Sequence, residues 1–229
     1  MLHYQPLVPL KVGLPRGFES LARWLHPEHG ELSARRLLDI AELAGLGGEV
    51  GGELLRLAYE DVRPWFDADD EAFVSFNVSA NQVADPDVGT RFLGRLSERG
   101  IDPRRLIVEV TEAAFSQGLV VQGNLDALRH AGVRVFLDDF GVGYSSLSHL
   151  HHFPVDGIKI DSSVIRPHVD ERLVRLIVSV AETLGIKTVA EGVETTEQLN
   201  AVTRLGVDYA QGYLLGRPAR VPTIRSMDG

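Results

Sequence analysis

The chain has 229 residues and no cysteine, and its acidic residues outnumber its basic residues by 32 to 23, for a formal net charge of −9. The lack of cysteine excludes disulfides and thiolate zinc sites, so any metal must take oxygen or imidazole ligands. The acidic balance argues against a DNA or RNA groove, because such grooves need a basic stripe. No apolar stretch is long enough to cross a bilayer, so we expect a cytoplasmic protein, with any membrane anchor outside this chain.

Two extended segments open the chain, at residues 2–10 and 16–24, before any helical pattern begins. Ser33 is a favourable N-cap for the first helix, whose apolar residues follow at helical spacing. A second helix is expected over residues 49–63 and should stop at Pro64, because proline lacks the backbone donor that a helix interior needs.

From residue 72 onward, short β-like runs alternate regularly with helical patterns. Strands are expected at residues 72–78, 105–110, 133–138, 157–160, 187–190 and 208–212. Helices are expected at residues 87–99, 119–130, 145–151, 171–184 and 196–205. Most of these helices end at a glycine just before a β-branched run, which is typical of repeated βα units.

Eight expected strands in one chain of this length favour an α/β fold of the TIM type, a closed (β/α)8 barrel, over an open doubly wound sheet. Because two strands precede the first helix, we expect the first strand to be antiparallel. No shift in composition and no low-complexity segment marks a boundary, so a single domain is expected over residues 1–229.

Polar side chains, most of them acids, lie where these expected strands end. They are Glu19, Asn77, Glu109, Asp138, Asp139, Lys159 and Glu191. The carboxyl ends of barrel strands form one rim, where active sites of this fold lie. Several ionised carboxylates share a pocket only when cations offset their repulsion, and oxygen ligands suit Mg²⁺, Mn²⁺ or Ca²⁺. A lone acid at a strand end is usually solvated, but the repetition along successive strands predicts a metal site.

The adjacent acids Asp138 and Asp139 could bridge two cations or bind one each. Two ions about 3.5–4 Å apart could activate water and stabilise both oxygens of an in-line phosphoryl displacement. Lys159 could orient the water or screen a phosphate oxygen, and Glu191 could take the proton or complete the second metal's shell.

Two other patterns are set aside. His149, His151 and His152 fit no compact zinc-ligand set and are interpreted as an exposed helix. The Asp-Phe-Gly triplet at residues 139–141 also occurs in protein kinases, but the kinase catalytic loop and lysine motif are absent.

Seven segments, in order, carry a resemblance to a known family: ESLARW, NVSANQ, EVTE, LDDFGVGYSSL, IKIDSS, VAEGVETTEQ and QGYLLGRP. Together they resemble the EAL-domain family of phosphodiesterases, which cleave the bacterial second messenger cyclic di-GMP, and the match runs over residues 4–218. The resemblance implies a barrel with one reversed strand, two Mg²⁺ or Mn²⁺ ions per site, and hydrolysis to linear pGpG by metal-activated water. It also implies a homodimer, with a sensory or GGDEF domain fused or separate outside this chain.

The resemblance also implies a role for individual residues. The metal ligands would be Glu19, Asn77, Glu109, Asp138 and Asp139. The catalytic residues would be Glu191, Lys159 and Asp139. Glu112 resembles the acid that anchors the loop 139–146, which is tied to metal binding and dimerisation. Contacts with the dinucleotide would come from Gln5, Leu21, Arg23, Gln211, Asp161, Glu194 and Pro218.

Departures from the family pattern are small and remove no expected ligand. Ser20 replaces a usual alanine, Val142 a commoner threonine, Ser162 a basic residue and Val164 a phenylalanine. Two alternatives to an enzyme stay open. One is a catalytically silent receptor for cyclic di-GMP that signals by conformation or partner contact. The other is a protein-interaction module that binds no nucleotide, which the retained Gln5, Arg23 and Gln211 disfavour.

Overall fold

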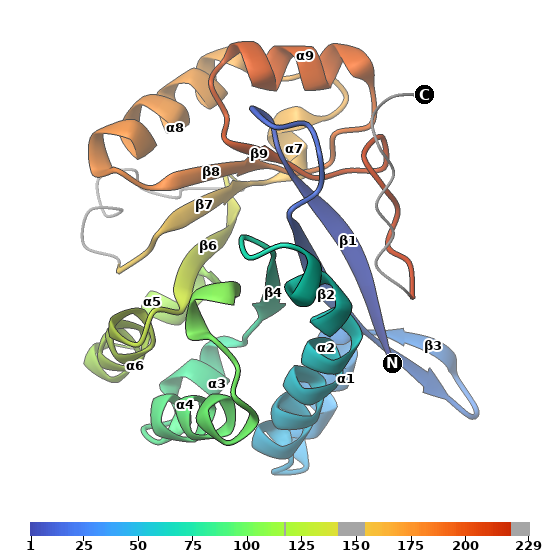
Figure 1. Cartoon of the computed structure of the whole chain (residues 1–229), viewed down its shortest axis with the longest axis vertical. Helices are drawn as coiled ribbons and strands as arrows, with labels where there is room; N and C mark the ends of the chain where they lie inside the picture. The colour runs from blue at the N-terminus through green and yellow to red at the C-terminus, as the bar shows by residue number, and fades with distance from the viewer. Residues whose placement is uncertain (117, 142–153, 221–229) are drawn as a thin grey trace.

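The first two strands, β1 (Leu2–Pro9) and β2 (Gly17–His26), form an antiparallel pair with Gln5 opposite Glu19. The connection between them is short, which permits a reversal but not the long crossover that a parallel pair requires. The computed structural model describes residues 1–116, 118–141 and 154–220, and Figure 1 shows their arrangement.

The remaining strands complete a closed barrel. From β2 the ladder runs parallel through β4 (Phe73–Asn77), β5 (Leu106–Thr111), β6 (Arg134–Phe140), β7 (Gly157–Ile160), β8 (Lys187–Ala190) and β9 (Tyr209–Ala210). β9 pairs antiparallel with β1, and β1 pairs with β2, which closes the circle. The predicted TIM-type barrel with an antiparallel first strand is confirmed.

A short additional strand, β3 (Gly30–Ser33), pairs with the end of β2 and was not predicted. Its four residues are largely exposed and lack the apolar alternation by which a strand is recognised. Ser33 then caps α1 (Ala34–Leu43) as predicted, because its hydroxyl accepts a hydrogen bond from the Arg36 amide.

The expected stop at Pro64 is wrong, because α2 (Gly47–Ala68) continues through it. Phe66, beyond the proline, is buried on the same face as Leu55 and Val62, and the Trp65 ring packs edge-on against Phe18 at 4.5 Å. Burial of these side chains outweighs the one backbone hydrogen bond that proline removes.

Further helices lie outside the barrel, as Figure 1 shows. They are α3 (Ala80–Ala84), α4 (Val88–Arg99), α5 (Glu112–Phe115), α6 (Leu119–His130), α7 (Ser162–Ile165), α8 (Glu171–Leu184) and α9 (Thr196–Arg204), with a 3₁₀ turn at Pro103–Arg105. The helix expected at 145–151 lies outside the described residues, as do His149, His151 and His152. Over the described ranges, none of the helices combines the length and apolarity that a membrane span requires.

An apolar layer fills the middle of the barrel. A cluster of buried side chains from five strands forms it: Leu7, Phe73, Ile107, Phe136 and Val189. Because side chains alternate along a strand, the residues two positions further toward the carboxyl ends of the parallel strands face inward as well. Those positions hold Glu109, Asp138 and Glu191, with Gln5 at the matching place on the reversed β1. Glu19, Lys159 and Gln211 stand two positions after Gly17, Gly157 and Tyr209, which pair with residues of this layer. The period of two therefore carries the expected polar residues to one end of the barrel interior.

Gly157 leaves the space that the Phe136 ring occupies in this layer. A Cβ at residue 157 would lie 2.6 Å from the ring, which is itself 2% exposed and enclosed by the core. We expect Gly157→Ala to lower the free energy of unfolding by about 1–3 kcal/mol, as overpacking does in closed cores. Gly94→Ala is the matched control, because a Cβ in this exposed part of α4 meets no atom within 4 Å and should stabilise the protein by about 0.5–1 kcal/mol. Urea unfolding of both variants measures the two changes, and equal stability of Gly157→Ala and the parent would contradict the packing argument.

Candidate functional site

Lys159, on β7, stands at the centre of the polar end of the barrel with 1% of its side chain exposed. Its Nζ lies 2.7 Å from Glu109 Oε2 and 2.7 Å from Glu191 Oε1. Asp138 Oδ1 is 3.3 Å and Glu19 Oε2 is 3.5 Å from the same nitrogen. One buried ammonium therefore contacts carboxylates from four different strand ends.

Glu19, on β2, is held by a chain of amides. The Asn77 side chain donates to Glu19 Oε1 at 2.7 Å, and the Gln211 side chain donates to Oε2 at 2.6 Å. Gln211 also donates to Gln5 Oε1 at 3.0 Å, and Gln5 in turn donates to the Gly216 carbonyl. These hydrogen bonds fix the Glu19 carboxylate and link it to residues near both ends of the sequence.

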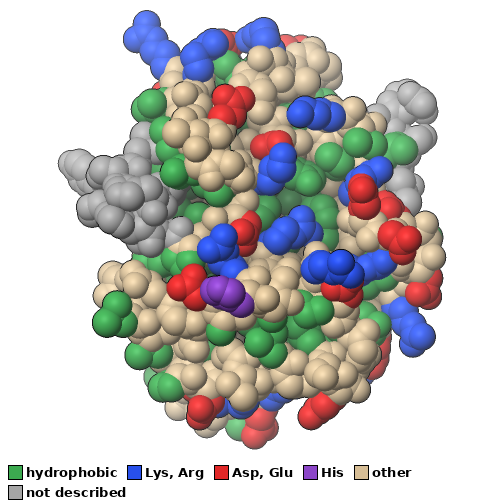
Figure 2. Space-filling view, turned by 60° about the vertical axis from the view of Figure 1, so that its left-hand side comes forward, with side chains coloured by type: hydrophobic (Ala, Val, Ile, Leu, Met, Phe, Trp, Pro, Cys, Tyr) green, Lys and Arg blue, Asp and Glu red, His purple; other side chains and the backbone are tan. Residues whose placement is uncertain are grey.

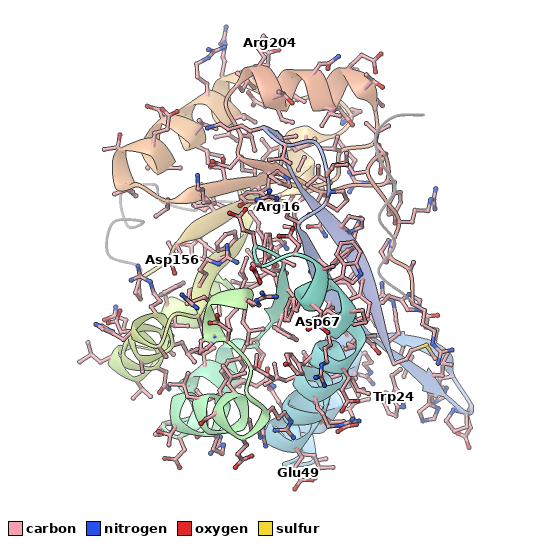
Figure 3. All side chains as sticks on the ribbon, in the orientation of Figure 1. Arg16, Trp24, Glu49, Asp67, Asp156 and Arg204 are labelled. Atoms are coloured by element: carbon pink, nitrogen blue, oxygen red, sulfur yellow. The ribbon has the colours of Figure 1, made fainter. Side chains whose placement is uncertain are left out.

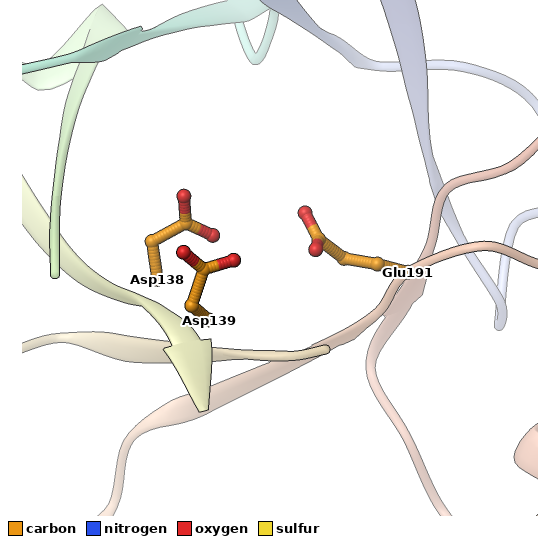
Figure 4. Close-up of side chains that lie close together, drawn as sticks. All are labelled: Asp138, Asp139 and Glu191. Carbon is orange, nitrogen blue, oxygen red and sulfur yellow. The ribbon is translucent and has the colours of Figure 1, made fainter. Parts of the chain in front are cut away.

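The neighbours Asp138 and Asp139 both turn toward the centre, although adjacent strand residues ordinarily face opposite sides. Asp139 has φ 57°, in the left-handed region, and the pairing of β6 with β7 shifts register between Leu137 and Phe140. The result is a group of three acids, Asp138, Asp139 and Glu191, whose ligand oxygens lie within 4.8 Å of one another. Figure 4 shows the two aspartates side by side with Glu191 opposite them.

Charge in the site is unbalanced in favour of the acids. Glu19, Glu109, Asp138, Asp139 and Glu191 face one ammonium, which leaves a formal charge of −4 when all are ionised. That is the charge that two divalent cations carry with the opposite sign. A pocket of this kind holds its carboxylates ionised when cations are present.

The pKa values reflect this crowding. Burial raises the pKa of Glu109 well above its usual range, and it raises the pKa of Glu191 to about 7, with Lys159 opposing both shifts. Burial also raises the pKa of Asp139, and the Asp138 charge adds to the effect. For Glu19, burial is outweighed by Lys159 and by the hydrogen bonds from Gln211 and Asn77, so its pKa falls. Burial would lower the pKa of Lys159, but the surrounding acids raise it well above its usual range.

The polar atoms of the site fit a hard metal ion. Among the described residues, Glu109 Oε1 and Gln211 Oε1 are buried without a hydrogen-bond partner, and buried Asp138 Oδ1 accepts no hydrogen bond but lies 3.3 Å from Lys159 Nζ. Buried oxygens without a partner are costly unless a cation or water fills the gap. All three are oxygen donors, which Mg²⁺ and Mn²⁺ prefer.

A cavity of about 200 Å³ opens beside these acids and receives several of the expected substrate contacts. Gln5, Leu21, Gln211 and Glu194 line it together with Glu19 and Glu191. The cavity therefore joins the acids to a surface that contains two amides, the apolar Leu21 side chain and the Glu194 carboxylate.

The remaining expected residues do not line this cavity: Arg23, Asp161, Pro218 and Glu112. Arg23 does not line this cavity, because its Nε pairs with Glu31 of β3 at 3.2 Å. Asp161 caps α7 by accepting from the Ser163 amide, and half-buried Pro218 precedes the bridge between Ala219 and Tyr4. Glu112 begins α5 at the end of β5, but residues 142–146 of the loop 139–146 that it is expected to anchor lie outside the described ranges.

The family model that matches this chain is that of the EAL domain, over residues 1–218. The chain belongs to the EAL-domain family. A Pseudomonas aeruginosa relative, named the bifunctional diguanylate cyclase/cyclic di-GMP phosphodiesterase MucR, is 38% identical over 95% of this chain and 33% of its own length. The probable cyclic di-GMP phosphodiesterase PdeB of Escherichia coli is 32% identical over 94% of this chain and 42% of its own length.

Solved structures of EAL domains share the barrel. The MucR phosphodiesterase in complex with c-di-GMP is 39% identical, with a TM-score of 0.86 over 96% of this chain and 91% of that one. The EAL domain of Mycobacterium smegmatis DcpA is 31% identical, with a TM-score of 0.78 over 96% and 92% of the two chains. This EAL domain spans between 26% and 42% of the length of the curated relatives it matches.

Arg166 also lines this EAL domain's cavity and was not predicted from the sequence. Its guanidinium follows α7, lines the cavity, and donates to Glu194 Oε1 at 2.9 Å and to Ser162 Oγ at 2.8 Å. A basic residue was expected at position 162, where this chain has serine. Arg166 brings a cation next to that serine from one helical turn away, and no strand-end pattern in the sequence marks it.

Proposed function

We propose that this EAL domain is a metal-dependent phosphodiesterase that hydrolyses cyclic di-GMP to linear pGpG. The observation that carries the proposal is the set of five carboxylates gathered around Lys159, with buried oxygens left unpartnered. The names of MucR and PdeB, and the c-di-GMP complex of MucR, support the choice of substrate.

Two groups of oxygen donors would hold the metals. One comprises Glu19, Asn77, Glu109 and Asp138, and the other comprises Asp138, Asp139 and Glu191. Bound Mg²⁺ or Mn²⁺ would supply positive charge that lowers the pKa of water and stabilises the charge developing on the phosphate.

Glu191 is placed to accept the proton of the attacking water. Burial raises its pKa to about 7 in the metal-free site, and bound cations would lower that pKa, so the carboxylate would be ionised and able to accept a proton at neutral pH. Lys159 holds the Glu191 carboxylate at 2.7 Å and keeps it facing the other acids. As the water oxygen bonds to phosphorus, the ribose 3′-oxygen leaves and takes up a proton.

The cavity beside the acids would hold the dinucleotide. Gln5 and Gln211 present amides to it, Leu21 presents an apolar surface, and Arg166 presents a guanidinium suited to phosphate. Glu194, paired with Arg166, is proposed to orient that guanidinium rather than to contact a phosphate.

The test is incubation of the chain with cyclic di-GMP and Mn²⁺ or Mg²⁺, with products separated by chromatography. We expect pGpG to form and EDTA to suppress it. If no product forms, a parallel calorimetric titration with cyclic di-GMP shows whether the chain still binds this ligand. Binding without product would replace the proposal with the silent receptor, and absence of both would leave the protein-interaction module.

We further propose that the active form is a homodimer that works with a sensory or GGDEF domain. The longer architecture of its relatives, among which MucR is named as bifunctional, supports the additional domain, whereas the homodimer is proposed from the family resemblance. Sedimentation of the chain with and without cyclic di-GMP measures its oligomeric state.

A further inference from the structure

The opposite end of the barrel interior carries a basic layer. Arg105, Arg134 and Lys187 stand two residues before the inward-facing Ile107, Phe136 and Val189, so they lie on the amino-terminal side of the apolar layer. With Lys11, Arg16 and Arg104 they line a cavity of about 760 Å³. Arg16, one of the residues that line this cavity, is labelled near the middle of Figure 3. The barrel is thus acidic at one end and basic at the other.

Four acids line the same cavity, and each is already paired with one of these cations. Arg16 pairs with Glu71, Arg104 with Asp102 at 2.8 Å, Arg105 with Asp70 at 3.1 Å, and Lys187 with Asp208 at 2.7 Å. Figure 2 shows such a mixture of Lys and Arg with Asp and Glu across the middle of one face. Six cations against four acids leave two positive charges over, on Lys11 and Arg134, in a chain whose net charge is −9.

Arg134 is the more unusual of the two surplus cations. Its guanidinium lies 4.6 Å from the centre of the Phe73 ring, and its Nε is buried without a hydrogen-bond partner in the part of the chain that the structure describes. The Asp156 carboxylate, whose charge acts on Arg134, already accepts from the Arg129 guanidinium at 2.8 Å and from the Val135 amide. Burial lowers the pKa of Arg134, and the charges of Tyr209 and Asp156 oppose that shift only in part.

We propose that this cavity is an oxyanion site for a small phosphate-bearing molecule, with Arg134 as its main donor. An arginine guanidinium matches the oxygens of a phosphate, and the part of the Arg134 guanidinium that lines the cavity would supply charge-assisted hydrogen bonds. The volume lies within the roughly 300–1,000 Å³ typical of small-molecule sites. Lys11 adds a second positive charge, and the partly exposed Tyr209 side chain offers apolar surface to an organic group. The site lies across the apolar layer from the acids and does not depend on the proposed function.

Calorimetric titration with orthophosphate and with adenosine monophosphate tests the proposal, in EDTA so that no metal at the acidic end captures phosphate. We expect both probes to bind the parent chain and Arg134→Gln to weaken binding by about tenfold or more, since a charged hydrogen-bonded pair is lost. Arg172→Gln is the matched control, because this arginine is exposed on α8 and does not line the cavity. Its substitution should change the affinity by less than about twofold.

The two probes distinguish the sources of the phosphate group. Tighter binding of adenosine monophosphate would assign the site to organic phosphates, and equal binding would assign it to free phosphate. If Arg134→Gln fails to fold, Arg134→Lys retains the charge without the guanidinium and should bind more weakly than the parent. The proposal is overturned if neither probe binds the parent chain, or if substitution of Arg134 leaves the affinities unchanged.

Discussion

Replacing Lys159 with methionine is expected to destabilise the metal-free protein by about 3–5 kcal/mol, the usual cost of removing one partner from a buried ion pair. Lys159 is almost fully buried and contacts Glu19, Glu109, Asp138 and Glu191. Methionine fills a similar volume but leaves these acids facing one another without a cation. Hydrolysis of cyclic di-GMP should be lost as well, because Lys159 positions Glu191.

Urea unfolding in EDTA and in Mn²⁺ measures this effect. Mn²⁺ should stabilise Lys159→Met more than it stabilises the parent, since the metal charge then replaces the missing ammonium among the acids. Lys187→Met serves as control, because Lys187 is exposed and its pair with Asp208 should be worth only about 0–1 kcal/mol. A Lys159→Met protein as stable as the parent in EDTA would show that the acids do not need this cation.

Glu191→Gln is expected to reduce turnover of cyclic di-GMP by about 10²–10⁴-fold, the range for loss of a general base. The amide keeps the size of the side chain but cannot accept the proton of water. Binding of cyclic di-GMP should change little, because Gln5, Leu21 and Gln211 still line the cavity. Single-turnover kinetics and a binding titration separate the two effects.

The same variant tests the raised pKa of Glu191. An acid with a pKa of about 7 is protonated below that pH and then cannot bind a cation, so the affinity of the parent for Mn²⁺ should fall as the pH drops from 8 to 6. The affinity of Glu191→Gln for Mn²⁺ should depend less on pH, and the remaining pH dependence should come from Glu109 and Asp139, whose pKa values are also raised. Glu182→Gln, exposed on α8, should match the parent in turnover and in pH dependence. Unchanged turnover in Glu191→Gln would remove this residue from the proposed mechanism.

Much of the barrel follows from local signals. Residues 157–160, 187–190 and the helix over 171–184 were expected at the bounds that the structure has. Their apolar runs, caps and terminal glycines act over a few residues, so they can be recognised in the sequence without knowing which elements pack against them. Pro64 failed as a stop signal because the burial of Phe66, contributed by distant elements, outweighs a local preference.

The strand-end positions of Glu109, Asp138, Lys159 and Glu191 are visible in the sequence, because a strand's period of two ties each to an apolar residue that must face inward. Their meeting at one ammonium, and the bond from Gln211 to Glu19 across 192 positions, depend on closure of the barrel. The left-handed turn at Asp139 and the basic layer around Arg134 also arise from packing between strands. Chain order specifies which side of a strand a residue faces, whereas the distance between two strands' side chains is set by how all eight strands close and tilt together.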